Sequence, residues 1–99
     1  MSSLQKLYTG YPILDHRLFD KLVYKLMERG FYVSRHSYSY RVFYRDKIVA
    51  GIHVYPGFNE VSVRLYRVFR DIAYEAMGDI LGVVREVFRG YKVRVAWYP

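Results

Sequence analysis

The stretch that decides the fold is residues 38–66, YSYRVFYRDKIVAGIHVYPGFNEVSVRLY. Apolar and polar side chains alternate along it with a period of two, which is typical of β-strands that bury one face. The alternation breaks at residues 45–47 (RDK) and 56–59 (PGFN), where turns are expected. Short strands that are joined by close turns, with no helix between them, predict an antiparallel meander.

Helical periodicity lies on both sides of this stretch. Residues 16–29 carry an apolar stripe on one helix face, with Asp15 at the N-cap position and Gly30 as a left-handed stop. A second stripe spans residues 69–88, or about five turns, and ends before Gly90. The stripes comprise Leu18, Phe19, Leu22, Val23, Leu26 and Met27, then Phe69, Ile72, Ala73, Ala76, Met77, Ile80, Leu81, Val84, Val87 and Phe88.

Two further segments alternate with a period of two and complete the order. They are residues 31–36, which should end near Ser37, and residues 91–98. The predicted order is therefore α-β-β-β-β-α-β. We expect an α+β fold in which both helices pack on one face of an antiparallel sheet of four to five strands. Residues 1–14 lack periodicity and are expected to be an N-terminal arm of a single domain, residues 1–99.

The composition excludes several classes of site. The chain has 99 residues and no cysteine, so disulfides and thiolate–zinc sites are excluded. No apolar run approaches the roughly 18 residues that a membrane span needs, so we expect a cytoplasmic protein with no membrane partner. Amides are scarce, with Asn59 and Gln5 alone. In this composition the chain resembles small uncharacterised proteins of hyperthermophilic archaea and their viruses, which implies a thermophile-like protein of the archaeal or host cytoplasm.

The charge is strongly basic and is carried mainly by arginine. The net charge is +7, with eleven Arg against five Lys. A basic field attracts phosphate backbones, and a guanidinium binds phosphate with two parallel hydrogen bonds or stacks on a base. The same charge also keeps a domain with twelve tyrosines soluble.

One face of the sheet is predicted to remain free, because the helices cover the more apolar one. Cations and aromatic rings interleave on the free face, which suits a DNA or RNA strand that is bound without sequence preference. A protein interface, as in a homodimer, or an ordinary solvated surface would carry the same residues. The buried set is expected to be Val42, Ile48, Ile52, Val54, Val61, Val63, Leu65, Val93, Val95 and Trp97. The free set is expected to be Arg41, Phe43, Arg45, His53, Tyr55, Arg64, Tyr66, Lys92, Arg94 and Tyr98. All of these residues except His53 and Tyr98 are predicted to bind nucleic acid.

No motif predicts catalysis, so we expect a binding protein with no cofactor, no metal and no small-molecule substrate. The three histidines lack metal-ligand spacing. Asp46, Lys47 and Glu60 are the loose candidates for a metal-dependent nuclease. Gly78 and Gly82 lie four residues apart in the second predicted helix. Either another backbone approaches the helix closely at these positions, or a stable domain simply tolerates the cost of glycine in a helix.

The element order of residues 15–89 resembles that of the double-stranded-RNA-binding domain. The basic cluster of that family would fall near Arg67 and Arg70, but its Lys-rich motif is absent and this chain has an additional strand. No function is transferred from this resemblance.

Overall fold

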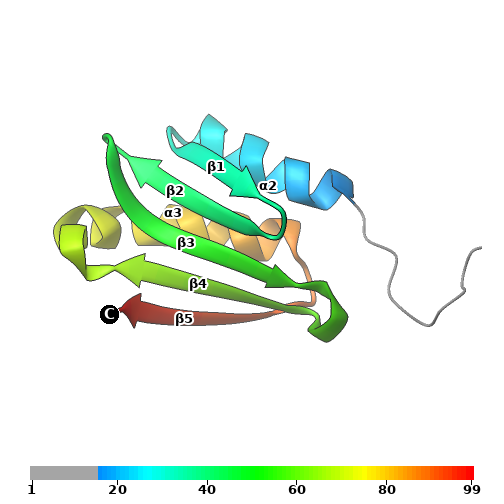
Figure 1. Ribbon diagram of the computed structural model, residues 1–99. Helices are drawn as coiled ribbons and strands as arrows, with labels where there is room; N and C mark the ends of the chain where they lie inside the picture. Colours follow the sequence, from blue (N-terminus) through cyan, green and yellow to red (C-terminus); the bar gives the residue numbers. More distant parts are fainter. Residues whose placement is uncertain (1–15) are drawn as a thin grey trace, which may run out of the picture.

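The computed structural model describes residues 16–99, and it has the predicted order of elements (Figure 1). The predicted arm and the Asp15 cap lie outside the described residues. The helices are α2 (His16–Glu28) and α3 (Arg70–Val87). The strands are β1 (Tyr32–His36), β2 (Ser39–Tyr44), β3 (Lys47–Tyr55), β4 (Glu60–Tyr66) and β5 (Lys92–Tyr98), and short 3-10 turns occupy Pro56–Phe58 and Arg67–Phe69.

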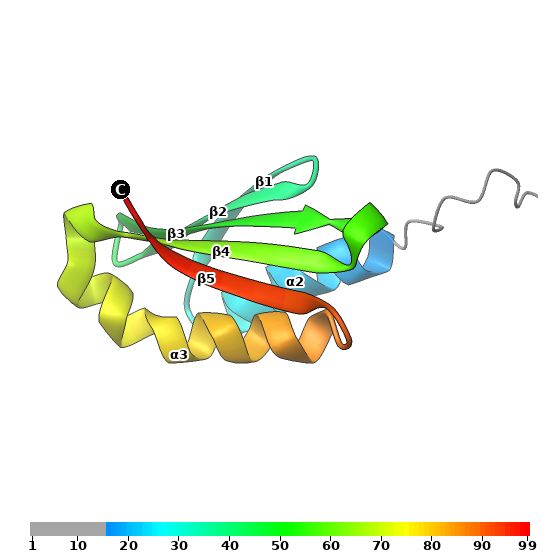
Figure 2. The ribbon, with the colours of Figure 1, turned by 90° about the horizontal axis from the view of Figure 1, so that it is seen from below.

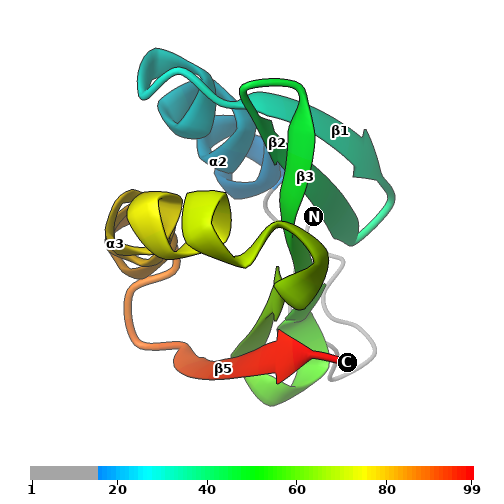
Figure 3. The same cartoon turned by 90° about the vertical axis from the view of Figure 1, so that its left-hand side faces the viewer.

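Both helices lie on the same side of a five-stranded sheet, as Figures 2 and 3 show. The core between these layers consists of apolar side chains, because the inward positions of β2, β3 and β4 meet the stripes of both helices. Two ion pairs of 2.8 Å reach α3 at the surface: Lys25 of α2 pairs with Glu86, and Arg29, directly after α2, pairs with Asp79. The α+β class and the packing of the helices on one face are thus confirmed. Neither of the helices found in residues 16–99 has the length and apolar character needed to cross a membrane.

The last strand departs from the antiparallel pattern. Strands β1 to β4 form an antiparallel meander in the order β1-β2-β3-β4, and β5 pairs with β4 in parallel. The reason is the connection: α3 crosses beneath the sheet and returns the chain to the end where β4 began (Figure 2). A strand that follows such a crossover must run in the same direction as the strand before it.

Helix α2 ends as the glycine predicts. Gly30 has φ +92°, in the left-handed region, and its N–H donates to the carbonyl of Met27. The N–H of Phe31 donates to the carbonyl of Leu26 at 3.1 Å. These bonds satisfy two of the free carbonyls at the end of the helix, and the Phe31 side chain that follows is buried in the core.

A β-bulge changes one predicted position. The register between β2 and β3 shifts after Val42, so that Val42 pairs with Ala50 and Phe43 pairs with Ile48. Val49 is the extra residue, and it is fully buried beside Ala50. The prediction that Ile48 faces the core is therefore wrong, because a residue inserted into β3 reverses the alternation before it.

Candidate nucleic-acid interface

The sheet surface that faces away from α2 and α3 is called here the open face. None of the elements within residues 16–99 covers it (Figure 2). Alternation and register place on it Tyr32, Ser34 and His36 of β1; Ser39, Arg41 and Phe43 of β2; Ile48, Gly51, His53 and Tyr55 of β3; Glu60, Ser62, Arg64 and Tyr66 of β4; and Lys92, Arg94, Ala96 and Tyr98 of β5.

The centre of the open face is a glycine between two arginines. Gly51 of β3 pairs with Arg41 of β2 on one side and with Arg64 of β4 on the other. Above it lies a shallow hollow of about 240 Å³, which both arginines help to line. We call this feature the Gly51 hollow.

Gly51 makes space for a neighbouring side chain, and its backbone angles do not call for glycine. Its φ lies outside the left-handed region, so any residue could adopt this conformation. A Cβ at Gly51 would lie only 2.7 Å from the Tyr66 hydroxyl oxygen and 3.5 Å from the Tyr66 Cζ. A glycine inside a strand costs roughly 0.5–1 kcal/mol relative to alanine, and here it makes room for the phenol of Tyr66.

Polar and aromatic groups surround the rest of the hollow. The Ser39 hydroxyl and the His53 Nδ1 form a hydrogen bond of 2.6 Å. The rings of His53 and Tyr55 lie 4.4 Å apart between centroids, and Tyr55 is 37% exposed. The result is a tilted pair of rings, inclined by 40°, with one partly accessible ring next to the arginines.

The arginines of the hollow are not neutralised by carboxylates. Arg41 makes no hydrogen bond or ion pair with any part of the described chain. Arg64 lies over the Tyr98 ring, with its Cζ 5.6 Å from the centroid. Among residues 16–99, Glu60 is the one acidic residue on the open face, and it pairs with Arg94.

Seven of the eight predicted binding residues lie on the open face. They are Arg41, Phe43, Tyr55, Arg64, Tyr66, Lys92 and Arg94.

Arg45 is the exception, and the prediction that it lies on the free face is wrong. It stands in the β2–β3 turn, and its guanidinium forms a 2.8 Å ion pair with Glu75 of α3. The turn has left-handed φ angles at Arg45 (+51°) and Asp46 (+64°). This geometry directs the side chain to the helical layer.

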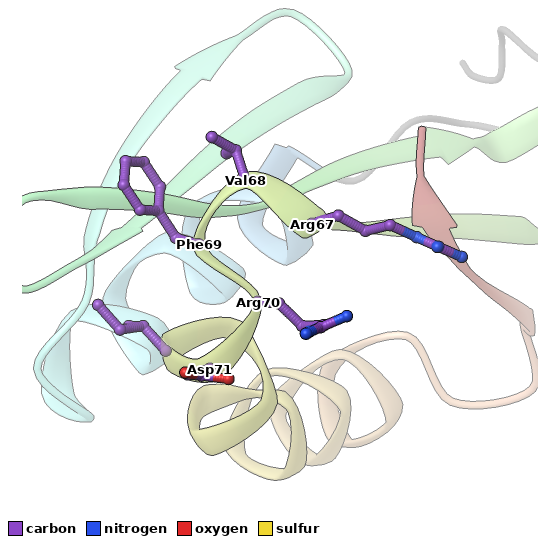
Figure 4. Close-up of a pocket in the computed structure, with 6 residues that line it drawn as sticks. Arg67, Val68, Phe69, Arg70 and Asp71 are labelled. Carbon is purple, nitrogen blue, oxygen red and sulfur yellow. The ribbon is translucent and has the colours of Figure 1, made fainter.

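Two features were missed from the sequence. One is the Gly51 hollow itself, which a glycine inside an otherwise regular strand could have indicated. The other is at the β4–α3 junction, where a pocket of about 390 Å³ is lined by the 3-10 turn and the first residues of α3. Figure 4 shows Arg67 and Arg70 pointing to the same side of this turn, away from Phe69 and Val68. They add two exposed cations beside the end of the sheet.

The nuclease candidates are not brought together. Asp46 and Lys47 stand at the start of β3, whereas Glu60 pairs with Tyr55 at its far end. Nine residues of strand separate these positions, which is on the order of 30 Å. Over residues 16–99 no three histidine or acidic side chains lie close enough to hold a metal ion.

Comparisons with protein-family models, with curated proteins and with solved structures gave no match to this chain.

Proposed function

We propose that this domain binds DNA or RNA through its open face, without strong sequence preference. The observation that carries the proposal is the presence of Arg41 and Arg64, which have no carboxylate partner among residues 16–99, on a sheet surface that also exposes aromatic rings. Each cation that contacts a phosphate releases condensed counterions and so contributes affinity at low salt.

The aromatic residues supply the second part of the recognition. Tyr55 and Tyr66 flank the Gly51 hollow, and Phe43 lies farther along β2 against Tyr32, with centroids 5.6 Å apart. A base that stacks on such a ring contributes about 1–3 kcal/mol, irrespective of its identity. Rings and cations on one surface therefore favour an unpaired strand with accessible bases.

The distribution of acidic residues also supports this surface. Within residues 16–99, every acidic residue except Asp46 and Glu60 lies on α2 or α3. The helical layer is thus of mixed charge, whereas the open face has an excess of cations. A polyanion would be oriented toward the open face as it approaches.

A protein interface on the same rings is the alternative function. Tyr32 is 66% exposed and lies with Phe43 near the β1 edge, where a partner could cover both rings. Two copies that met face to face would bring Arg41 and Arg64 of each copy together, and this repulsion disfavours a homodimer on the centre of the face. Light scattering tests the alternative: a stable dimer that Phe43→Asp disrupts would favour it.

Fluorescence anisotropy with labelled single- and double-stranded oligonucleotides tests the proposal. If Arg41, Arg64 and Lys92 each contact one phosphate, the logarithm of affinity should fall with the logarithm of salt with a slope of about −2 for single strands and about −3 for duplexes. Absence of binding by micromolar protein at about 50 mM salt would contradict the proposal.

A further inference from the structure

The Gly51 hollow differs from the rest of the open face because its donors converge. Arg41 of β2 and Arg64 of β4 line it, together with Ser62 and Tyr66, whose side chains carry hydroxyls. No carboxylate belongs to its lining, because Glu60 lies outside it and pairs with Arg94. A concave site lined by two arginines, by several residues that carry hydroxyls and by no acidic residue has the polarity of an anion site.

The glycine fixes one of these donors. Because residue 51 has no side chain, the Tyr66 hydroxyl can lie over β3 between the two arginines. A Cβ on residue 51 would be only 2.7 Å from the hydroxyl oxygen. Tyr98 also carries a phenol on this face, in edge contact with Tyr66 at 6.0 Å between centroids, but it does not line the hollow. The two tyrosines therefore differ in whether their hydroxyl faces the site.

We infer that the Gly51 hollow holds one phosphate group of the bound nucleic acid, with Arg41 and Arg64 on either side and the Tyr66 hydroxyl donating to it. This inference rests on the proposed function, and it adds a fixed position for the nucleic-acid strand on the open face. A guanidinium matches the geometry of phosphate oxygens, and two of them share the charge of the group. The tilted ring pair of His53 and Tyr55 lines one side of the hollow, and the base next to the held phosphate would stack on the exposed part of Tyr55.

The first test is an NMR titration of the full chain, followed through its backbone amide signals. Inorganic phosphate is added in one series, and sodium chloride of equal ionic strength in a matched series. The inference predicts saturable shifts at Arg41, Gly51 and Arg64 with phosphate alone. Equal shifts in both series would overturn it.

A double-mutant cycle then tests the role of the glycine on oligonucleotide affinity. Tyr66→Phe removes the donor and should weaken binding about fivefold. Gly51→Ala should weaken it similarly, because the new Cβ displaces the hydroxyl. In the Tyr66→Phe background the same Gly51→Ala change meets only the ring carbon at 3.5 Å, an ordinary contact, so it should cause no further loss.

The matched control is Tyr98→Phe, which removes a hydroxyl outside the hollow and should leave the affinity unchanged. If Tyr66→Phe and Gly51→Ala both bind like the wild type, the phosphate position is wrong while nucleic-acid binding stands. If phosphate shifts the three amides but no oligonucleotide binds, the hollow is an anion site and the proposed function is wrong.

Comparison of 5′-phosphorylated with 5′-hydroxyl oligonucleotides shows which phosphate of the strand the hollow holds. A gain in affinity of about tenfold from the 5′-phosphate assigns a terminal phosphate, and equal affinity assigns an internal one.

Discussion

Tyr40 brings a hydroxyl into the core, where its side chain is 1% exposed, and it donates a 3.3 Å hydrogen bond to the carbonyl of Phe19 in α2. Burial raises the pKa of the Tyr40 phenol well above its ordinary value of 10.0. The neutral phenol is therefore retained in the folded state, whereas the unfolded chain ionises at the ordinary pKa.

The first prediction concerns this residue. Tyr40→Phe should lower the free energy of unfolding by about 1 kcal/mol near neutral pH, because the Phe19 carbonyl loses a partner. The Tyr40 contribution is fully present below the unfolded pKa and is lost as pH rises above it, by about 1.4 kcal/mol per pH unit. Urea denaturation at about pH 7 and about pH 11 should show the gap between wild type and variant closing or reversing at the higher pH. A gap of the same size at both pH values would contradict the assignment.

The β2–β3 turn gives a second prediction. Arg45 and Asp46 both have left-handed φ angles, as in the two-residue hairpin turn that normally contains Asn-Gly or Asp-Gly. Asp46→Gly should raise the free energy of unfolding by about 0.5–1 kcal/mol, because glycine adopts φ of +64° without strain. The midpoint of urea denaturation measures the gain. Asp46→Ala is the control and should give no gain; equal stabilisation by both changes would show that the turn strain is not the cause.

For single residues, the sequence predicts well on which face of the sheet a strand side chain lies, but it predicts poorly where a side chain in a turn points. Arg41, Tyr55 and Arg64 lie on the open face because a period of two assigns them there. The position of Arg45 depends on the handedness of the turn and on Glu75, which lies 30 residues away in α3. Neither of these is encoded by local alternation.

Among the elements, α3 carries two glycines with no packing role in the described structure. A Cβ at Gly78 or at Gly82 would meet no atom within 4 Å, so no other backbone of residues 16–99 approaches them closely. Simple tolerance is therefore the explanation that fits the described chain.

Gly78→Ala and Gly82→Ala should each raise the free energy of unfolding by about 1 kcal/mol, since alanine is the better helix former and the space is open. Thermal and urea denaturation measure both variants. Gly90→Ala is the contrasting change: its φ is +82°, so alanine there should lower stability. A loss of stability in the helix variants would contradict the open space around the two glycines.

The strands show why some of the topology was predictable. The limits of β1 to β4 follow from alternation and turn residues, and the helix–sheet layering follows from the stripes of α2 and α3. The bulge at Val49 was not predictable, because isoleucine, valine and alanine at positions 48–50 suit either face. The parallel direction of β5 could have been inferred from the length of the helical crossover before it.

For the whole molecule, the arrangement of charge matters more than the net charge of +7. The ion pairs Lys25–Glu86, Arg29–Asp79 and Arg45–Glu75 all involve the helical layer. On the open face the cations exceed the acids, and Arg41 and Arg64, which lie nearest the centre, have no carboxylate partner within the described chain. The central claim is therefore that one face, and not the overall charge, binds nucleic acid.

The most direct measurement compares two double variants of equal net charge by oligonucleotide anisotropy at about 50 mM salt. Arg41→Gln with Arg64→Gln removes the central cations of the open face, and Lys21→Gln with Arg85→Gln removes two exposed cations of the helical layer. We predict that the first pair weakens binding at least tenfold and reduces the salt slope by about 1–2, while the second changes affinity less than about threefold. Equal losses in the two variants would contradict the account, because binding would then follow net charge alone.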